Sequence, residues 1–380
     1  MKQRTDPDDN QFMQECLALA KRGAGRVSPN PMVGAVLVKK GKILSRGWHR
    51  EFGKAHAEVD CLSRAKGSVA GATMYVNLEP CAHVGKTPAC APRVAASGVS
   101  RVVIGMIDPN PLVAGRGIRY LRAHGIEVTV GVCNEESRFL NRAFVTHITK
   151  HRPYIHLKLA QSLDGRISDS RRRWISGETS RRLVHQWRTV HDAVLVGAGT
   201  VLSDNPSLNV RFVSGRDPQV VILDGRLRIS PDARLVGSAK KRRVVVCTST
   251  GSLKKKVSRA RALARLGVEV IAFPSKGDRL DLARVLRELY ETGIGSILVE
   301  GGADVASSFV EAHLVDEYSV FIAPRFVGVG VVGFSTGPGS HVRDGNLEMK
   351  TICHELCGED LLVRTFRERY SPEVVKRLSL

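Results

Sequence analysis

The first 150 residues alternate between helix-like and strand-like spacing of apolar side chains. Apolar positions recur at helical intervals over residues 12–22 and 56–66. Short apolar runs predict strands, the first two forming a hairpin, at residues 34–38, 41–44, 73–78 and 102–105. Residues 121–130 predict a short helix that ends at Gly125 and then a last strand. This order is typical of an α/β layer with mixed strands.

A second series of strands and helices begins after a break near residues 147–154, where Lys150-His151-Arg152-Pro153 interrupts the pattern. Its strands are short buried runs between helical stretches, at residues 155–160, 193–197, 220–224, 243–247 and 296–300. Such runs favour a largely parallel sheet. Because no internal repeat relates the two series, we expect two different α/β domains, residues 1–150 and residues 151–380.

Composition supports two folded domains and excludes several classes of protein. A chain of 380 residues suits about two cores, and 43% apolar with 25% charged residues excludes a disordered or collagen-like chain. The longest uncharged apolar run, residues 326–334, is far shorter than the roughly 18 residues that cross a bilayer. Residues 1–10 lack the pattern of a signal or transit peptide. We therefore expect a cytoplasmic protein whose eight cysteines are thiols or metal ligands.

The formal net charge of +21 is spread over both halves of the chain and is not confined to a tail. Local basic runs occur at residues 171–173, 240–243 and 254–256. Two interpretations stay open: the runs form solvated loops, or they attract phosphorylated small molecules.

Four residues of the first half indicate a zinc enzyme. His56, Cys81 and Cys90 can fill three positions of a tetrahedral Zn²⁺ site and leave the fourth for water, whose pKa the metal lowers. Glu58, two residues after the histidine, would take the proton of that water and deliver it to a leaving amine. This order, His-x-Glu followed by Pro-Cys and a second Cys, is the signature of zinc deaminases.

The spacing of the two cysteines distinguishes between kinds of zinc deaminase. Deaminases of nucleic acids and free nucleosides usually have two residues between the cysteines, whereas eight separate Cys81 from Cys90. This longer loop carries His83, Lys86 and Thr87, which suit a phosphate and a ribose. A solvated loop without a ligand is the alternative.

Motifs around these residues resemble the bifunctional riboflavin biosynthesis deaminase-reductases. They are Ser28–Gly34, Gly53–Glu58, Glu79–Cys81 through Cys90, Asp108–Pro111 and Val113–Gly117. The resemblance, which runs from about Phe12 to about Glu368, implies a first domain with the cytidine-deaminase-like α/β/α fold. It also implies residues that hold the pyrimidine and its ribose phosphate: Asn30, His49, His83, Lys86 and Thr87. Ala89, where the family often has proline, should leave the metal ligands unaffected.

Residue patterns alone are less decisive in the second half. Gly197-Ala198-Gly199-Thr200 follows a strand, but the third glycine of a dinucleotide-binding fingerprint is missing. Glu300-Gly301-Gly302-Ala303-Asp304 ends a strand and precedes a helical pattern over residues 305–314. Exposed N–H groups at that helix start favour an anion such as pyrophosphate.

The resemblance continues here and implies a dihydrofolate-reductase-like α/β domain that uses NADPH. The matching segments are Lys158–Gly165, Trp174-Ile175, Asp192–Gly197 and Thr200–Leu208. Positions that match cofactor contacts are Ala160, Trp174, Thr200, Asp204, Gly302, Ala303, Asp304, Val305, Ala306, Ser307 and Ser308. Positions that match substrate contacts are Arg188, Leu208, Arg211 and Glu300. The two arginines suit a phosphate because guanidinium groups bind oxyanions through two hydrogen bonds.

Four further features of the second half concern single residues or short segments, and the first two leave alternatives open. Lys158 would orient or protonate near the reacting ribose carbon, or it is a buried structural lysine. Arg172 stands where the family usually has a serine that touches substrate, and it either adds a phosphate contact or points to solvent. Gly328 and Gly330 are spaced differently from the family's Gly-Gly pair. Cys353-His354-Glu355-Leu356-Cys357 has metal-binding residue types, but we expect an ordinary turn before a terminal strand.

These observations predict a two-step enzyme of riboflavin synthesis. Its first domain would deaminate a diaminopyrimidine ribonucleotide phosphate with zinc, and its second would reduce the ribosyl chain to the ribityl form with NADPH. The family also implies a homodimer or higher homo-oligomer, a small-molecule substrate, and neither nucleic-acid nor membrane partners. Two rivals remain: a nucleic-acid or nucleotide deaminase with a non-catalytic basic companion domain, and a structural zinc module with a degenerate second domain.

Overall fold

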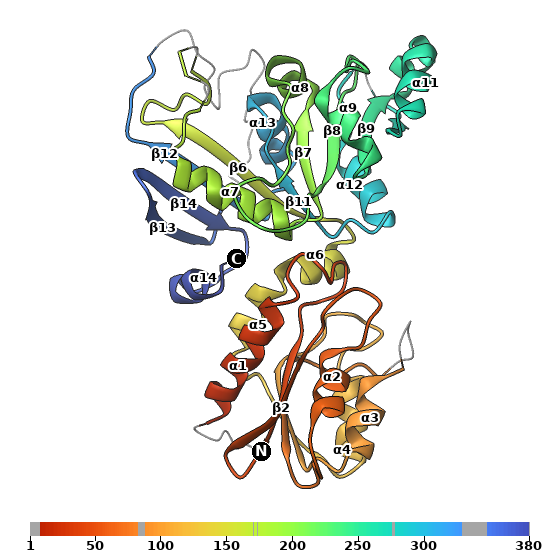
Figure 1. Cartoon of the computed structure of the whole chain (residues 1–380), viewed down its shortest axis with the longest axis vertical. Coiled ribbons are helices and arrows are strands. Elements are labelled where there is room, and N and C mark those ends of the chain that lie inside the picture. Colours follow the sequence, from red (N-terminus) through yellow and green to blue (C-terminus); the bar gives the residue numbers. More distant parts are fainter. Residues whose placement is uncertain are drawn as a thin grey trace. The chain divides into compact units, whose positions relative to one another are not determined.

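The structure, a computed structural model, describes residues 8–82, 88–169, 171–172, 174–275, 278–328 and 348–379. The chain divides into two compact units: residues 1–151 together with 373–380, and residues 152–372. Figure 1 shows a twisted sheet with flanking helices in each unit. Among the described residues, no helix combines the length and apolar character needed to cross a bilayer.

The first unit is built on a five-stranded sheet in the order β2-β1-β3-β4-β5. Its strands are β1 (Gly34–Lys39), β2 (Lys42–Trp48), β3 (Thr73–Leu78), β4 (Arg101–Met106) and β5 (Glu127–Val130). β1 pairs antiparallel with β2 and β3, whereas β3, β4 and β5 run parallel. The predicted hairpin and mixed sheet are therefore confirmed.

Helices cover both faces of this sheet because neighbouring strand residues point to opposite sides. They are α1 (Asp9–Lys21), α2 (Ala57–Arg64), α3 (Cys90–Ala96), α4 (Arg116–Ala123), α5 (Asn134–Leu140) and α6 (Arg142–Lys150). Tyr75 and Val103 pack against α1, whereas Met74 and Val102 pack with α2, α3 and α4. The result is an α/β/α sandwich, as the resemblance implied.

The second unit contains a nine-stranded sheet in the order β10-β9-β8-β7-β11-β6-β12-β14-β13. Its strands are β6 (Tyr154–Ser162), β7 (Ala193–Gly197), β8 (Gln219–Leu223), β9 (Val244–Ser249), β10 (Glu269–Phe273), β11 (Ser296–Val299), β12 (Glu317–Ala323), β13 (Thr351–Cys357) and β14 (Asp360–Phe366). All pairs from β10 to β12 are parallel, and β14 and β13 are added antiparallel. The sheet is largely parallel, as predicted.

This sheet is also covered on both faces. The helical segments are α7 (Glu178–Val190), α8 (Ala198–Asp204), α9 (Arg234–Gly237), η1 (Ser238–Lys240), α10 (Thr250–Lys255), α11 (Val257–Arg265), α12 (Leu282–Glu291) and α13 (Ala303–Glu311). On β7, Ala193 and Leu195 share a core with α12 and α13, whereas Val194 and Val196 pack with α8, α9 and α11. This alternation explains why the strands read as continuous apolar runs.

Three local features differ from expectation. Residues 147–150, placed in the break, complete α6. Residues 353–357, expected to be a turn, belong to strand β13, because they pair with residues 360–364 of β14. The predicted second domain extended to residue 380, whereas residues 373–380 group with the first unit. There α14 (Pro372–Leu378) is held by Lys21, whose Nζ donates to the carbonyl oxygen of Arg377 at 2.8 Å.

Candidate active sites

Three metal-binding side chains meet at one edge of the first unit's sheet. His56 directly precedes α2, Cys81 follows β3, and Cys90 is the first residue of α3. The Nδ1 atom of His56 lies 3.7 Å from the Sγ of Cys81 and 3.3 Å from the Sγ of Cys90. The ligand atoms of all three residues lie within 4.8 Å of one another.

The donor set fits a zinc ion. Bonds of about 2.0 Å to nitrogen and 2.3 Å to sulfur place tetrahedral ligands about 3.5 Å apart, in agreement with these distances. Hydrogen bonds from Cys90 and His56 lower the pKa of the Cys81 thiol to about 4. The contact with Cys81, and then burial, raise the pKa of Cys90. One sulfur is thus a thiolate, and a bound cation would displace the proton of the other.

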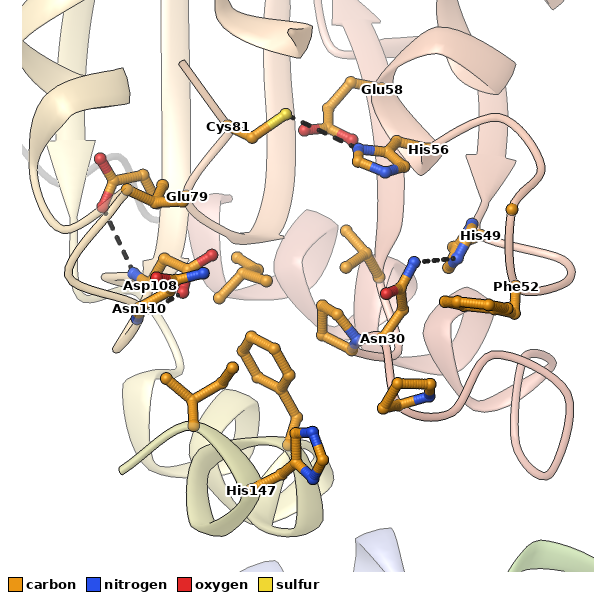
Figure 2. A pocket seen from close by; sticks show the side chains of 18 of the residues that line it. Asn30, His49, Phe52, His56, Glu58, Glu79, Cys81, Asp108, Asn110 and His147 are labelled. Atoms are coloured by element: carbon orange, nitrogen blue, oxygen red, sulfur yellow. Dashed lines mark hydrogen bonds between the residues drawn. The ribbon is translucent and has the colours of Figure 1, made fainter. Parts of the chain in front are cut away.

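Glu58 lies in the first turn of α2, two residues after the histidine, and its side chain is buried. Burial raises the pKa of Glu58 to about 7, although the nearby His56 opposes this shift. Figure 2 shows its carboxylate beside His56 and Cys81. A carboxyl group with a pKa near neutrality can both accept and donate a proton, which is what general acid–base catalysis requires.

A cavity of about 320 Å³ opens beside these groups, and Asn30 and His49 line it. The Nδ1 of His49 donates to the carbonyl oxygen of Ala55 at 3.0 Å, which leaves Nε2 to accept from the Nδ2 of Asn30 at 3.3 Å. Figure 2 shows this pair on one wall of the cavity. His83, Lys86 and Thr87 lie outside the described residues.

The opposite wall contains polar residues to which the sequence patterns assigned no role. Asp108 and Asn110 line the cavity, and burial raises the pKa of Asp108 to about 6. Their loop is anchored by Glu79, whose carboxylate accepts from the backbone N–H of Asp108 at 3.3 Å and of Gly117 at 2.9 Å. At Gly117 a Cβ atom would lie 2.0 Å from the carbonyl oxygen of Pro80. The motif Asp108–Pro111 was the available signal, but it did not show which side chains face the cavity.

In the second unit, several predicted residues gather at the carboxyl ends of neighbouring parallel strands. Val299 of β11 is in register with Leu157 of β6 and Leu195 of β7. The next residue, Glu300, therefore lies beside Lys158. Strand order runs in opposite directions on the two sides of β11, and in such sheets ligands bind outside the carboxyl ends of the strands at that point.

Arg188 reaches this point from α7 and binds Glu300 through two hydrogen bonds, with Nε–Oε1 2.6 Å and Nη2–Oε2 2.8 Å. Its Nη1 donates to the carbonyl oxygen of Asn209 at 3.0 Å. Arg188 stays a predicted phosphate contact, and in this structure its guanidinium is hydrogen-bonded to Glu300 and Asn209. Although burial acts against it, Arg188 and then Lys158 keep the pKa of Glu300 below its ordinary value. Burial lowers the pKa of Lys158.

The predicted cofactor segment, residues 302–308, forms the start of α13, with Gly302 at its N-cap. No side chain caps this helix start. Cβ atoms at Gly301 and Gly197 would lie 2.5 and 2.7 Å from Val305, so only glycines allow the two strand ends to approach the helix this closely. The helix therefore offers backbone N–H groups at the carboxyl ends of β7 and β11, which fits the pyrophosphate of a dinucleotide.

The other predicted residues of this unit lie on several different elements. Ala160 is on β6, and Thr200 and Asp204 are on α8. Trp174 is 48% exposed, and Arg181 lies 5.6 Å above its ring. Arg172 is exposed and lines a separate cavity of about 420 Å³ with Arg171 and Arg325. Gly328 is described, whereas Gly330 lies outside the described residues.

Two further predicted contacts lie in the segment between α8 and β8. Leu208 is buried with a positive φ of 47°. Arg211 is exposed, and its backbone N–H donates to the Nδ1 of His185 at 3.0 Å. Burial, and then Arg188 and Arg211, lower the pKa of His185 to about 4. His185 had no recognisable signal in the sequence, because a lone histidine on a helix is not diagnostic.

Comparison with known proteins identifies the family of both halves of the chain. Residues 6–106 match the cytidine and deoxycytidylate deaminase zinc-binding region, and residues 153–363 match the RibD C-terminal domain. The riboflavin biosynthesis protein RibD of Aquifex aeolicus is 41% identical over 365 residues, which cover 95% of this chain and 99% of that protein. The chain belongs to the RibD family. The resemblance inferred from the motifs is confirmed.

Other RibD proteins support the same assignment. The Escherichia coli protein is 38% identical over 87% of this chain and 92% of its own length. The crystal structure of a diaminohydroxyphosphoribosylaminopyrimidine deaminase/5-amino-6-(5-phosphoribosylamino)uracil reductase from Thermotoga maritima is 39% identical. It matches with a TM-score of 0.82 over 94% of this chain and 98% of that chain. RibD of Acinetobacter baumannii matches with a TM-score of 0.83 at 33% identity, over 95% and 99% of the two chains.

The fold class and overall function follow from membership in the RibD family. The chain is a bifunctional riboflavin biosynthesis enzyme that combines a zinc-dependent deaminase with an NADPH-dependent reductase. The predicted order of folds, cytidine-deaminase-like and then reductase, is confirmed. A deaminase with a non-catalytic companion is not favoured, because the second unit matches the RibD C-terminal domain throughout.

Proposed function

We propose that the first unit deaminates a phosphorylated diaminopyrimidine ribonucleotide, with zinc held by His56, Cys81 and Cys90 and with Glu58 as the proton carrier. The observation that carries this proposal is the convergence of one imidazole and two sulfurs within 4.8 Å, beside a buried carboxyl group. The substrate class is taken from the related Thermotoga maritima enzyme, whose name contains such a pyrimidine. The reductase activity is assigned to the second unit, residues 152–372.

Zinc bound at this site would lower the pKa of a water molecule enough for it to act as a nucleophile near neutral pH. Glu58 accepts the proton of the attacking water at a carboxylate oxygen and then donates it to the nitrogen that leaves as ammonia. Its pKa near 7 suits both steps, because neither protonation state is strongly favoured.

Recognition of the pyrimidine is assigned to the polar walls of the cavity. Asn30 is oriented by His49 through the hydrogen bond described above, and Asp108 and Asn110 face it from the loop held by Glu79. These carboxyl and amide groups can pair with the exocyclic amines and ring nitrogens of a pyrimidine. His83, Lys86 and Thr87 remain proposed contacts of the ribose phosphate.

NADPH bound in the second unit would supply the hydride that reduces C1′ of the ring-opened ribose and gives the ribityl chain. Lys158 is placed to donate a proton or hydrogen bond there, because it lies beside Glu300 at the sheet edge and the surrounding protein disfavours its charged form. Arg188 acts by positioning Glu300.

The remaining contacts are proposed from their places in the fold. Arg211 and Leu208 adjoin this centre as substrate contacts, and Arg172 lines the second cavity. The proposed cofactor contacts are Ala160, Trp174, Thr200, Asp204 and residues 302–308.

A homodimer is proposed to form through β13, the terminal strand of the nine-stranded sheet. Ile352 and Leu356 are 62% and 77% exposed on it, and an apolar edge strand invites pairing with another strand. Ile352→Lys with Leu356→Lys should give monomers in sedimentation analysis, whereas an unchanged oligomer excludes β13 as the interface. None of the eight cysteines forms a disulfide, which supports the proposed cytoplasmic location. Nucleic acid is not proposed to take part in either reaction.

The direct test is an assay of both half-reactions on the zinc-loaded full chain. Ammonia release from the phosphorylated diaminopyrimidine, followed by NADPH oxidation, is the expected result. Absence of ammonia release from zinc-loaded protein, with NADPH oxidation intact on the deaminated compound, would overturn the deaminase assignment alone.

A further inference from the structure

The positive charge of the second half of the chain is concentrated in one segment, residues 225–266. This segment contains thirteen Lys and Arg residues and a single acidic residue, Asp232. The other residues from 151 to 380 contain 23 basic and 24 acidic side chains, so they carry almost no net charge. The segment therefore supplies more than half of the chain's net charge of +21. Neither reaction proposed above uses this charge.

The elements of this segment lie side by side on the second unit. They are α9, η1, β9, α10 and α11. Leu235 of α9 and Leu263 of α11 belong to one core cluster, and Leu253 of α10 packs against it. Figure 1 shows α9, β9 and α11 next to one another, close to the end of the sheet that β10 terminates. The exposed side chains of the three helices therefore share one region of the surface.

Only part of the positive charge is used to stabilise the fold. Arg242 donates to the carbonyl oxygen of Leu208 at 2.9 Å, and Arg243 pairs with Glu269 at 2.8 Å. Other basic side chains are exposed, and no carboxylate of the described residues lies within 4 Å of them. We call the following six the basic surface: Lys240, Lys241, Lys254, Lys255, Arg261 and Arg265.

The composition of the segment restricts the kind of partner. Residues 225–266 contain no Phe, Tyr, Trp or Met. Aromatic and methionine side chains are enriched at the centre of protein–protein interfaces, and aromatic rings stack on the bases of single-stranded nucleic acids. Lys and Arg alone suffice for the phosphate backbone of a duplex, which carries one negative charge per about 1.7 Å of its axis. The composition therefore favours a duplex backbone.

The arrangement of the charges favours an extended anion over a small one. Arg261 and Arg265 are four residues apart on α11, so they lie on the same side of the helix, about 6 Å apart along its axis. Lys254 and Lys255 are at the end of α10, which packs against α11. No residue of the basic surface lines either of the two cavities described above. An anion that contacts all six must extend over several helices.

We propose that the basic surface binds the phosphate backbone of double-stranded nucleic acid without sequence preference. This binding is separate from both reactions, because no residue of the basic surface belongs to either active site. It releases counterions from the duplex, so its affinity falls steeply as the salt concentration rises.

The test measures binding of the zinc-loaded full chain to short labelled duplexes by fluorescence anisotropy. Duplex DNA and duplex RNA form separate arms, each with two unrelated sequences. At physiological salt Kd should be about 10⁻⁶ to 10⁻⁴ M in at least one arm, and the same for its two sequences. Neutralising four positions should weaken binding at least about ten-fold and reduce the slope of log K against log salt by about 3 to 4. The four changes are Lys254→Gln, Lys255→Gln, Arg261→Gln and Arg265→Gln.

A charge-matched control removes four positive charges from exposed positions of the first unit. Its changes are Lys40→Gln, Lys42→Gln, Lys66→Gln and Arg119→Gln. This control should bind the duplexes as the wild type does. Equal weakening in the two variants overturns the proposal, because net charge would then be responsible. Ammonia release, NADPH oxidation and thermal unfolding should match the wild type in both variants, which shows that the folds are intact.

Two other polyanions distinguish the classes of partner. Polyglutamate represents an acidic protein, and vesicles that contain phosphatidylserine represent an anionic membrane. Tighter binding of either one than of the duplexes at equal salt shows that the nucleic-acid assignment is wrong. Tighter binding of a duplex, lost in the four-position variant and kept in the control, supports it.

Discussion

The two candidate sites are assembled in different ways. The deaminase centre uses side chains from the ends of adjacent elements, α2, β3 and α3, all within residues 56–90. The reductase centre joins Lys158, Arg188 and Glu300 from three elements spread over more than 140 residues, brought together by the register of parallel strands. The residues of a metal site therefore form a compact sequence signature. The residues of a site at the carboxyl ends of strands depend on which strands become neighbours in the sheet.

Their electrostatics differ as well. In the first unit, Glu58 and Asp108 are buried without a described cation bound to them, and burial raises the pKa of both. In the second, Glu300 is bound by Arg188 and lies near Lys158, which together keep its pKa low. The first site is thus arranged for proton transfer. The second is arranged to hold fixed charges around a substrate and cofactor.

Removal of zinc should produce the largest difference between the two activities. Chelation is expected to abolish ammonia release, because the sulfur and imidazole donors have no other means of activating water. NADPH oxidation with the deaminated intermediate should remain within about two-fold, since its residues belong to a separate compact unit. Metal analysis and both assays on the same sample check this result, and restored zinc should restore ammonia release. Equal loss of both activities contradicts independent sites.

Glu58→Gln is expected to lower kcat for ammonia release by about 10²- to 10⁴-fold, the usual contribution of a general acid–base residue. The amide cannot carry the proton, but it keeps the size of the side chain. Bound zinc and NADPH oxidation should be unchanged. Steady-state rates with metal analysis decide this, and an unchanged turnover rules out the proton-carrier role.

Arg188→Met should lower reductase activity by about 10²-fold, because it leaves Glu300 buried beside Lys158 without its hydrogen-bonded partner. Ammonia release should not change. Arg182→Met on the same helix is the control, since the exposed Arg182 pairs with Glu178 and donates to the carbonyl oxygen of Phe212 but does not bind Glu300, and its effect should stay below two-fold. A similar loss in both variants indicates damage to α7 rather than loss of the ion pair.

The smallest expected effect is that of pH on the stability of the second unit. His185 accepts a backbone hydrogen bond at Nδ1 and its pKa is lowered to about 4, against about 6.5 in the unfolded chain. Neutral His185 therefore contributes stability that is present above pH 6.5 and is lost as pH falls toward 4, by about 2–3 kcal/mol. His185→Gln should remove this part of the acid sensitivity. Thermal unfolding between pH 4.5 and 7.5 measures it, with the exposed His124→Gln as control, and identical pH profiles contradict the assignment.

Much of the fold was predictable because its strands are short apolar runs with clear ends. The strand at residues 73–78 and the strand at 193–197 coincide with β3 and β7. β13 was missed because its burial pattern leaves His354, Glu355 and Leu356 exposed, so it lacks the apolar run of a central strand. The end of α6, residues 147–150, was placed in the break because His147 interrupts the apolar face of the helix and the polar run from Lys150 to Pro153 follows directly.

The amino-acid sequence by itself determined the family and predicted the zinc donors and the proton carrier, because these depend on residue types at fixed short spacings. Only the tertiary structure decided that Arg188 binds Glu300, 112 residues away, that Glu79 anchors the loop carrying Asp108, and that α6 closes the deaminase cavity. The physical reason is that periodicity reports which side of an element is buried. It carries no information about which other element covers that side.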